Sequence, residues 1–278
     1  MGCGRSGSTI LGFVLGNGEK ACDLGEVIDF LKRDGKPNSF ETGSENARFW
    51  YRITQLMKSD ISSVFTKETK KKLIEYEHHR MFLAIYLGLT GHKIKQIYHN
   101  FINHLYGHIT EQVQEKEIFI DTSKYPSRAL LLTSLLNNFD VGIVHLVRHP
   151  TKVVKSFGNK STRQGYKGFI SANIYYFCIN LFCVLVKLRV GNKKYIKIKY
   201  EDIIKQPNYE IDKISKKFFI DLEYVKKMIL NDKPLKRGFP FNGNRMRMQD
   251  EVVLKKNNFS YKKNIKNLIT MFINAIWY

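Results

Sequence analysis

Residues 2–9 read Gly-Cys-Gly-Arg-Ser-Gly-Ser-Thr, and residues 10–16 continue with the apolar stretch Ile-Leu-Gly-Phe-Val-Leu-Gly. Glycines and hydroxyl side chains before an apolar helix are typical of a loop whose backbone N–H groups turn inward around an anion. The dipole of the following helix adds to the attraction for negative charge. The stretch therefore predicts an anion site at a helix N-terminus, and the alternative is a plain glycine-rich helix entry without a ligand.

The loop nearly has the spacing of the phosphate-binding motif G-x-x-x-x-G-K-[ST], counted from Gly2 to Gly7. Ser8 replaces the lysine that defines that motif, and the cation of the loop is Arg5. A nucleoside triphosphatase needs the lysine on its β- and γ-phosphates, so ATP or GTP chemistry is disfavoured. The loop fits a smaller anion held by N–H groups, hydroxyls and one guanidinium.

A loop of this kind normally follows a buried strand that anchors its first glycine. Only Met1 precedes Gly2, so we expect the first strand of the sheet to be missing from this chain. A missing central strand would leave backbone groups of its neighbours unpaired, which is costly in a buried sheet. We therefore expect both stability and activity to be affected.

Along the rest of the chain, short segments that are apolar, or that alternate apolar and polar residues, lie between segments with a helical pattern. Strands are expected over three segments, after a short element at 21–24: 117–121, 141–147 and 195–200. Helices are expected over four segments: 47–57, 66–88, 93–114 and 169–186. This order is typical of βαβ units on a parallel sheet. The sequence predicts an α/β fold in a single domain, residues 1–278, with a helical segment at about 40–114 and a final helix in the tail after 233.

Composition narrows the class of protein. The chain has 278 residues, 43% of them hydrophobic, which is enough for a substantial core. It has 46 basic and 25 acidic residues, a net charge of +21, but the lysines are scattered, so nucleic acid is not expected as the main partner. An anionic cofactor or an acidic acceptor would be attracted equally well. The four cysteines have no C-x-x-C or metal-ligand spacing, so neither zinc nor a disulfide framework is expected.

The segment 169–186 carries no charge and is long enough to suggest a membrane span. Ser171, Asn173 and Asn180 interrupt it, and Lys187 and Arg189 follow at once. We therefore expect a buried helix of a soluble core and no transmembrane segment in this chain.

Polar residues follow the expected strands, where ligands bind in open α/β sheets. Asp121-Thr-Ser-Lys124 follows the first strand, and Arg148 follows the second. Ser156 lies eight residues after Arg148, and Lys160 follows Ser156 at i+4 on the same helix face. These groups suggest a second phosphate site, although Arg148 alone could equally be a structural ion-pair partner.

Five motifs occur together, in order: R-S-G-S-T, D-T-S-K-x-P-x-R, L-V-R-x-P-x-x-V-V-x-S, K-Y-E-D-I-x-x-x-P and G-N-R-M-R. Each is weak alone, but the combination, from Arg5 to Arg247, resembles the sulfotransferases that use 3′-phosphoadenosine-5′-phosphosulfate (PAPS). It is most similar to the branch with an Arg-Ser-Gly-[ST]-Thr loop, which includes carbohydrate and tyrosylprotein sulfotransferases. The resemblance implies a P-loop-type three-layer sandwich with a central parallel sheet.

The resemblance also implies how the donor is bound. The 5′-phosphosulfate would lie in the loop formed by Arg5, Ser6, Gly7, Ser8 and Thr9. The remaining donor contacts would come from five residues further along: Arg148 and Ser156 to the 3′-phosphate, Lys160 and Tyr200 to the nucleotide, and, as a weaker candidate, Arg245. His149 stands where an acid is commoner in the family, which would add positive charge near the nucleotide.

The catalytic base of the family is a glutamate shortly after the loop helix, and Glu26 falls at that place. Glu26 would take the proton of the attacking hydroxyl, while Arg5 and the loop stabilise the leaving group. The alternative is that Glu26 is only an acid at a helix start. His99, His104 and His108 lie on one expected helix without the spacing of a zinc site, so no metal is expected.

The expected activity is transfer of a sulfuryl group from PAPS to a carbohydrate or protein hydroxyl. A non-catalytic or truncated protein that binds nucleotides or polyanions is the alternative, and a phosphotransferase is disfavoured by Ser8. Acceptor choice would lie in the helical segment at about 40–114. The resemblance is compatible with a cytoplasmic location in a prokaryote, or with the Golgi membrane if a eukaryotic N-terminal anchor precedes this chain.

Overall fold

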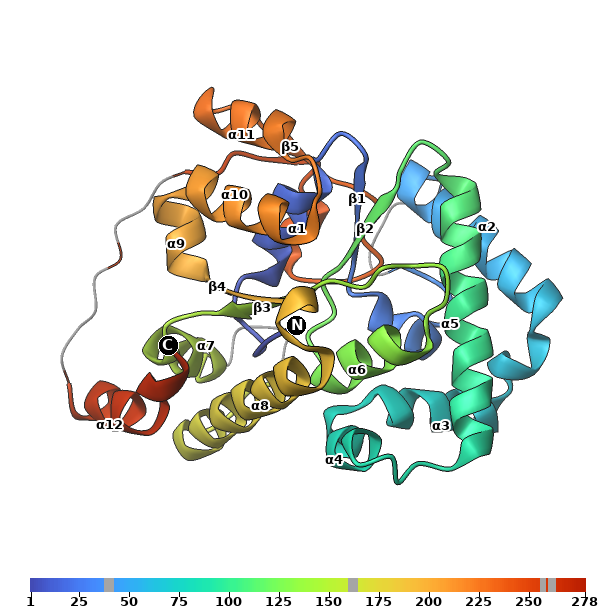
Figure 1. The fold of residues 1–278 in the computed structure, drawn as a ribbon, viewed down its shortest axis with the longest axis horizontal. Coiled ribbons are helices and arrows are strands. Elements are labelled where there is room, and N and C mark those ends of the chain that lie inside the picture. The colour runs from blue at the N-terminus through green and yellow to red at the C-terminus, as the bar shows by residue number, and fades with distance from the viewer. Residues whose placement is uncertain (38–42, 160–164, 256–258, 260–263) are drawn as a thin grey trace. The chain divides into compact units, whose positions relative to one another are not determined.

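The computed structural model describes residues 1–37, 43–159, 165–255, 259 and 264–278. The chain forms two compact units, each built from separate stretches of sequence (Figure 1). The first unit comprises Met1–Ser8, Gly142–Ile220 and Leu254–Tyr278, and the second comprises Thr9–Val141 and Asp221–Val253. Helix α1 (Ser8–Gly16) begins where the first stretch of the first unit ends.

The first unit is built on a parallel strand pair. Strands β3 (Ile143–Val147) and β4 (Tyr195–Lys199) pair in register from Ile143–Tyr195 to Val147–Lys199. The other elements of this unit are α7 (Pro150–Phe157), α8 (Phe169–Val190), η5 (Asn192–Lys194), α9 (Tyr200–Lys205), α10 (Pro207–Phe218), α12 (Ile265–Asn274) and η7 (Ala275–Trp277). Proline stands at the start of α7 and of α10, where its missing N–H costs no helical hydrogen bond. Buried side chains of α7 and α8 pack together with Val147 into the core of this unit.

Met1 lies alongside β3. Its amino group donates to the Val144 carbonyl (2.8 Å), and the Leu146 N–H donates to the Met1 carbonyl (3.0 Å). Gly2 follows with φ +147°, and a Cβ there would lie 2.4 Å from the Leu146 oxygen, so only glycine fits. Met1 and Gly2 therefore anchor the loop on β3. That a first strand is missing stays a prediction.

The second unit has its own parallel pair, β1 (Ala21–Gly25) with β2 (Ile118–Asp121), and a short antiparallel pair, β5 (Leu235–Lys236) with β6 (Glu251–Val252). Its helices are α2 (Glu45–Asp60), α3 (Lys67–Glu77), α4 (Phe82–Tyr86), α5 (His92–Gln112), α6 (Pro126–Leu135) and α11 (Glu223–Leu230). Short 3₁₀ turns join them: η1 (Val27–Asp29), η2 (Leu31–Arg33), η3 (Ser62–Phe65), η4 (His79–Met81) and η6 (Arg245–Met248).

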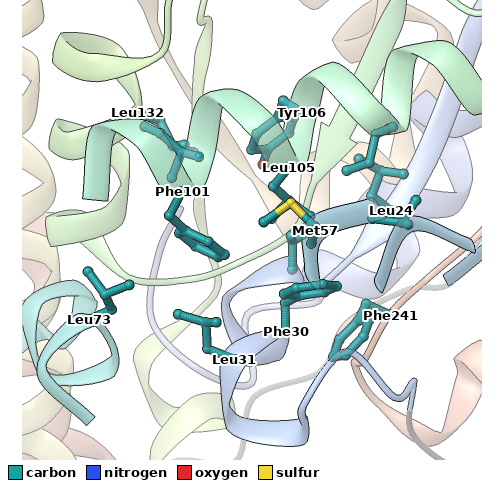
Figure 2. Packing of buried hydrophobic residues seen from close by; sticks show 14 of the residues in the cluster. Leu24, Phe30, Leu31, Met57, Leu73, Phe101, Leu105, Tyr106, Leu132 and Phe241 are labelled. Carbon is teal, nitrogen blue, oxygen red and sulfur yellow. The ribbon is translucent and has the colours of Figure 1, made fainter. Parts of the chain in front are cut away.

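An aromatic and aliphatic core holds the second unit together (Figure 2). Phe30, fully buried, lies 5.5 Å from the ring of Phe241 and 6.3 Å from that of Phe101, which comes from α5. Trp50 of α2 packs edge-on against Phe241 at 4.9 Å. Helices α2 and α5, from the predicted helical segment, thus fix the turn that follows β1.

The parallel pairs confirm an α/β fold, and the three expected strands appear with nearly the expected bounds. The prediction of one continuous helix over 66–88 is wrong. The chain breaks at His78, which is extended (φ −69°, ψ 142°) and accepts a hydrogen bond from the Arg80 N–H on its ring Nδ1 (3.2 Å). The single-domain prediction stays a prediction.

The prediction of a buried helix over 169–186 is correct for one face of that helix only. Helix α8 buries the row that contains Ala172, Tyr176 and Cys183, while Ile170 and Ile174 are exposed. Among the described residues, α8 is the one helix long and apolar enough to cross a membrane, by length and composition alone.

Candidate active site

The Gly-Arg-Ser-Gly loop of the first unit is held in an unusual backbone conformation. Arg5 has φ +70°, a left-handed value that costs a residue with a side chain about 1 kcal/mol or more. Gly7 has φ +95°, and a Cβ there would lie 2.3 Å from the ring of Tyr200. Glycine therefore lets Tyr200 lie directly against the loop.

Arg148 joins the loop to the end of β3. Its Nη1 donates to the Arg5 carbonyl (3.0 Å), and its guanidinium lies over the Tyr200 ring at 4.6 Å from the centroid. Arg5 in turn donates from Nη1 to the Ser156 hydroxyl (3.4 Å) and lies over the Phe157 ring. Four of the residues predicted for the donor site are thus brought together within the first unit.

This cluster contains hydrogen-bonding groups that its described neighbours do not satisfy. The Ser6 hydroxyl and the Arg148 Nε are buried, and no described residue bonds to either. Within the described part of the chain, Arg148 has no carboxylate partner, which disfavours the structural ion-pair alternative. Burial also lowers the pKa of Arg5, because desolvation penalises its charge. An anion rich in oxygen acceptors, such as a phosphate ester, would satisfy these groups.

His149 does not add the positive charge expected from the sequence. Burial lowers its pKa to about 4, with a smaller contribution from Lys152. Its ring Nδ1 lies 2.8 Å from the Thr151 hydroxyl, and its backbone N–H donates to the buried Glu201 carboxylate (3.1 Å). His149 is neutral at pH 7, so the prediction of an extra cation is wrong.

Glu26 lies in the second unit, directly after β1. Its backbone N–H donates to the Asn242 carbonyl (2.8 Å), and its carboxylate forms an ion pair with Lys124. Both side chains are largely buried, with 14% and 13% exposed. Glu26 precedes η1, but its side chain makes no capping hydrogen bond to that turn. Its carboxylate is therefore engaged by a cation rather than by the helix start.

Sequence reasoning missed the pairing of Lys124 with Glu26. The parallel register of β1 and β2 places Gly25 opposite Asp121, so the residues that follow the two strands meet at one edge. The signal was present in D-T-S-K at the strand end. The residues that follow the two strands form a second set of contacts: the Lys32 ammonium lies 2.7 Å from an Asp29 carboxylate oxygen and 5.5 Å from the centroid of the Tyr125 ring. This edge therefore carries several charged side chains close to the end of β1.

Arg128, the last residue of the same motif, has a structural role. It is 1% exposed, donates from Nε to Asp121 (2.9 Å) and pairs through Nη1 with the buried Glu77. Tyr106 also donates to Asp121 (2.8 Å), and Tyr98 donates to Glu77 (2.7 Å). Burial acts to raise the pKa of Asp121, but the Arg128 charge and the hydrogen bonds outweigh it and lower that pKa. This network fixes the end of β2, on which Lys124 depends.

The remaining predicted residues are less defined. Thr9 lies in the second unit, where its hydroxyl accepts from the Asn244 N–H (3.4 Å). Arg245 begins η6, but its side chain lies outside the described residues, as does the whole of Lys160. On α5, Nε2 of His108 lies 2.9 Å from an Asp60 carboxylate oxygen. The described residues contain no group of three or more His, Cys, Asp or Glu that could hold a metal ion.

Residues 1–224 match the Sulfotransferase family, a range that includes the loop, Glu26, Lys124 and Arg148. The chain belongs to this family. Membership supports sulfuryl transfer as the general activity, and the G-N-R-M-R motif lies beyond the matched range. No curated protein matches the chain.

The solved structures that are similar to the chain include two sulfotransferase domains. One comes from the curacin biosynthetic pathway, with 14% identity and a TM-score of 0.55 over 99% of this chain and 95% of that one. The other comes from the olefin synthase of Synechococcus PCC 7002, with 18% identity and a TM-score of 0.50 over 100% and 92%. At these identities the likeness shows the fold alone.

Proposed function

We propose that this chain transfers a sulfuryl group from PAPS to a hydroxyl of a carbohydrate or protein acceptor, on a P-loop-type sandwich fold. One observation carries the proposal: Arg148, Ser156 and Tyr200 lie against the loop that contains Arg5 and Gly7, and the buried Ser6 hydroxyl and Arg148 Nε have no described partner. A nucleotide with phosphates at both the 5′ and 3′ positions matches two adjacent guanidinium groups and the glycine-rich loop.

In this proposal the loop from Arg5 to Thr9 holds the 5′-phosphosulfate, and Arg148 with Ser156 holds the 3′-phosphate. Tyr200, Lys160 and, more weakly, Arg245 contact the nucleotide. Tyr200 already lies against Gly7 and under Arg148, which supports a place beside the loop.

The reaction is an in-line displacement at sulfur, analogous to phosphoryl transfer. The acceptor oxygen forms a bond to sulfur while the bond from sulfur to the bridging phosphate oxygen breaks. The electron pair of that bond leaves with adenosine 3′,5′-bisphosphate, and the hydroxyl proton passes to Glu26. The ion pair with Lys124 fixes the position of the Glu26 carboxylate, and Arg5 with the loop N–H groups stabilises the charge on the leaving phosphate.

Ligand-dependent thermal unfolding tests the donor. Adenosine 3′,5′-bisphosphate should raise the melting temperature of the full chain much more than ATP at equal concentration, because ATP lacks the 3′-phosphate. Equal shifts for both nucleotides, or a shift with heparin only, would favour the alternative of a non-catalytic polyanion-binding protein. Release of adenosine 3′,5′-bisphosphate from PAPS, dependent on an added sugar or peptide, would then establish turnover.

A further inference from the structure

The last helix of the first unit exposes one apolar face. Phe272 is 93% exposed, Ile276 76% and Ile265 75%. The exposed apolar side chains recur at helical spacing along α12 and into η7: Ile265, Leu268, Ile269, Phe272, Ile273 and Ile276. Residues three and four apart lie on the same side of a helix, so these side chains form a single stripe.

The opposite side fixes α12 on the first unit. Asn274 is fully buried and donates to the Asn173 side chain of α8 (2.9 Å), and the Trp277 ring packs edge-on against Phe177 at 5.1 Å. Figure 1 shows α12 (red) next to α7 and α8. The orientation of α12 is therefore set by buried contacts, and its apolar stripe points away from them.

Helix α8 extends this surface. Ile170 and Ile174, one turn apart, are 72% and 58% exposed. They lie on the helix row next to the one that carries Asn173 and Phe177, the residues that contact Asn274 and Trp277. The buried row of α8 contains hydrogen-bonded Asn173 and Asn180 and belongs to the core of the unit. We call Ile170, Ile174 and the α12 stripe the apolar face.

The stretches of chain that form this surface are strongly basic. The sequence has no acidic residue between Asp140 and Glu201, and none after Glu251. Lys266 is exposed on α12 beside Ile265, whereas the exposed Lys187 and Arg189 lie at the other end of α8, about 20 Å along the helix from Ile174. Soluble proteins rarely expose apolar patches of this kind without a partner. An apolar helix face with an exposed lysine, on a stretch of chain without acidic residues, matches the boundary between headgroups and acyl chains of an anionic bilayer, whereas a second basic copy would be repelled.

We propose that the apolar face docks the chain on an anionic lipid surface, with α12 lying in the plane of the interface. Phe272, Ile276 and Ile265 insert among the acyl chains, and Lys266 of α12 meets the lipid phosphates. The inference does not depend on the proposed donor or acceptor.

Co-sedimentation of the full chain with vesicles tests this proposal. Binding is expected to phosphatidylcholine vesicles with about 30% phosphatidylserine, to weaken at 0.5 M salt, and to be much lower for pure phosphatidylcholine. The double substitution Phe272→Ser with Ile276→Ser should reduce partitioning at least about tenfold, because two apolar side chains no longer leave water. Both residues are highly exposed, so the fold should tolerate the change.

Phe219→Ser is the matched control, because Phe219 is 95% exposed in the same unit but lies outside the apolar face. The control should bind vesicles like the wild type. Equal binding by the double variant, or no binding by the wild type, would overturn the proposal. A wild-type dimer that ignores vesicles, and that the double variant converts to a monomer, would overturn it too and assign the face to a second copy.

Discussion

Replacement of Arg148 by alanine separates the two phosphates of the proposed donor. Arg148 donates to the Arg5 carbonyl and stacks on Tyr200, so the substitution loosens the loop as well as removing the proposed 3′-phosphate contact. Loosening of the loop weakens the binding of any nucleotide that uses it. The loss of one charged hydrogen bond and one stacking contact suggests that this costs about 1 kcal/mol of binding free energy. The 3′-phosphate contact, made by charge-assisted hydrogen bonds, is worth about 2 kcal/mol or more.

Titration calorimetry at constant salt measures the loss of binding free energy for each of the two nucleotides. For Arg148→Ala, adenosine 3′,5′-bisphosphate should bind about 100-fold more weakly, and adenosine 5′-phosphate only about fivefold more weakly. Arg189→Ala is the control, because it removes the same charge from an exposed position on α8. It should change both affinities slightly and equally. Equal losses for the two nucleotides in Arg148→Ala would refute the assignment of this guanidinium to the 3′-phosphate.

Three further substitutions test the second unit. Glu26→Gln should keep nucleotide affinity near that of the wild type but lower turnover by about 10²-fold or more in a steady-state assay, because the proton acceptor is lost; full turnover would exclude Glu26 as the base. Arg128→Met should lower the free energy of unfolding by about 3–5 kcal/mol in denaturant titration, because it leaves Asp121 and Glu77 buried without their cation; a change below 1 kcal/mol would contradict this. Asp23→Asn should stabilise the chain at pH 8 but hardly at pH 4. Burial raises the pKa of Asp23 to about 7, so the folded state holds a proton that the unfolded state releases near pH 4, and wild-type stability falls as the pH rises through this window by up to about 4 kcal/mol. Melting curves of both proteins at several pH values measure the difference, and a pH-independent offset would show that Asp23 does not titrate there.

Local patterns were sufficient to locate the strands and the loop, because strand periodicity and glycine conformation depend on nearby residues. Patterns could not predict the break at His78. Glu77, just before it, is drawn into the buried pair with Arg128, a contact between residues far apart in sequence. Likewise, the apolar composition of α8 gave no means of telling its buried row from its exposed one. Which row is covered depends on where β3, α7 and α12 pack.

The two motif arginines differ in how completely their hydrogen-bonding capacity is used. Arg128 is bonded through all three nitrogens, to Asp121, Glu77, Tyr98 and Tyr106, and its side chain needs no further partner. The Arg148 side chain, in contrast, has one described hydrogen bond, to a backbone carbonyl, and a buried Nε that no described residue meets. A buried guanidinium costs free energy unless its donors are satisfied, so the unsatisfied one is the better candidate for a ligand contact. Arg128 lies in the first turn of α6 and Arg148 directly follows β3, and the carboxylates of Asp121 and Glu77 beside Arg128 distinguish its surroundings from those of Arg148.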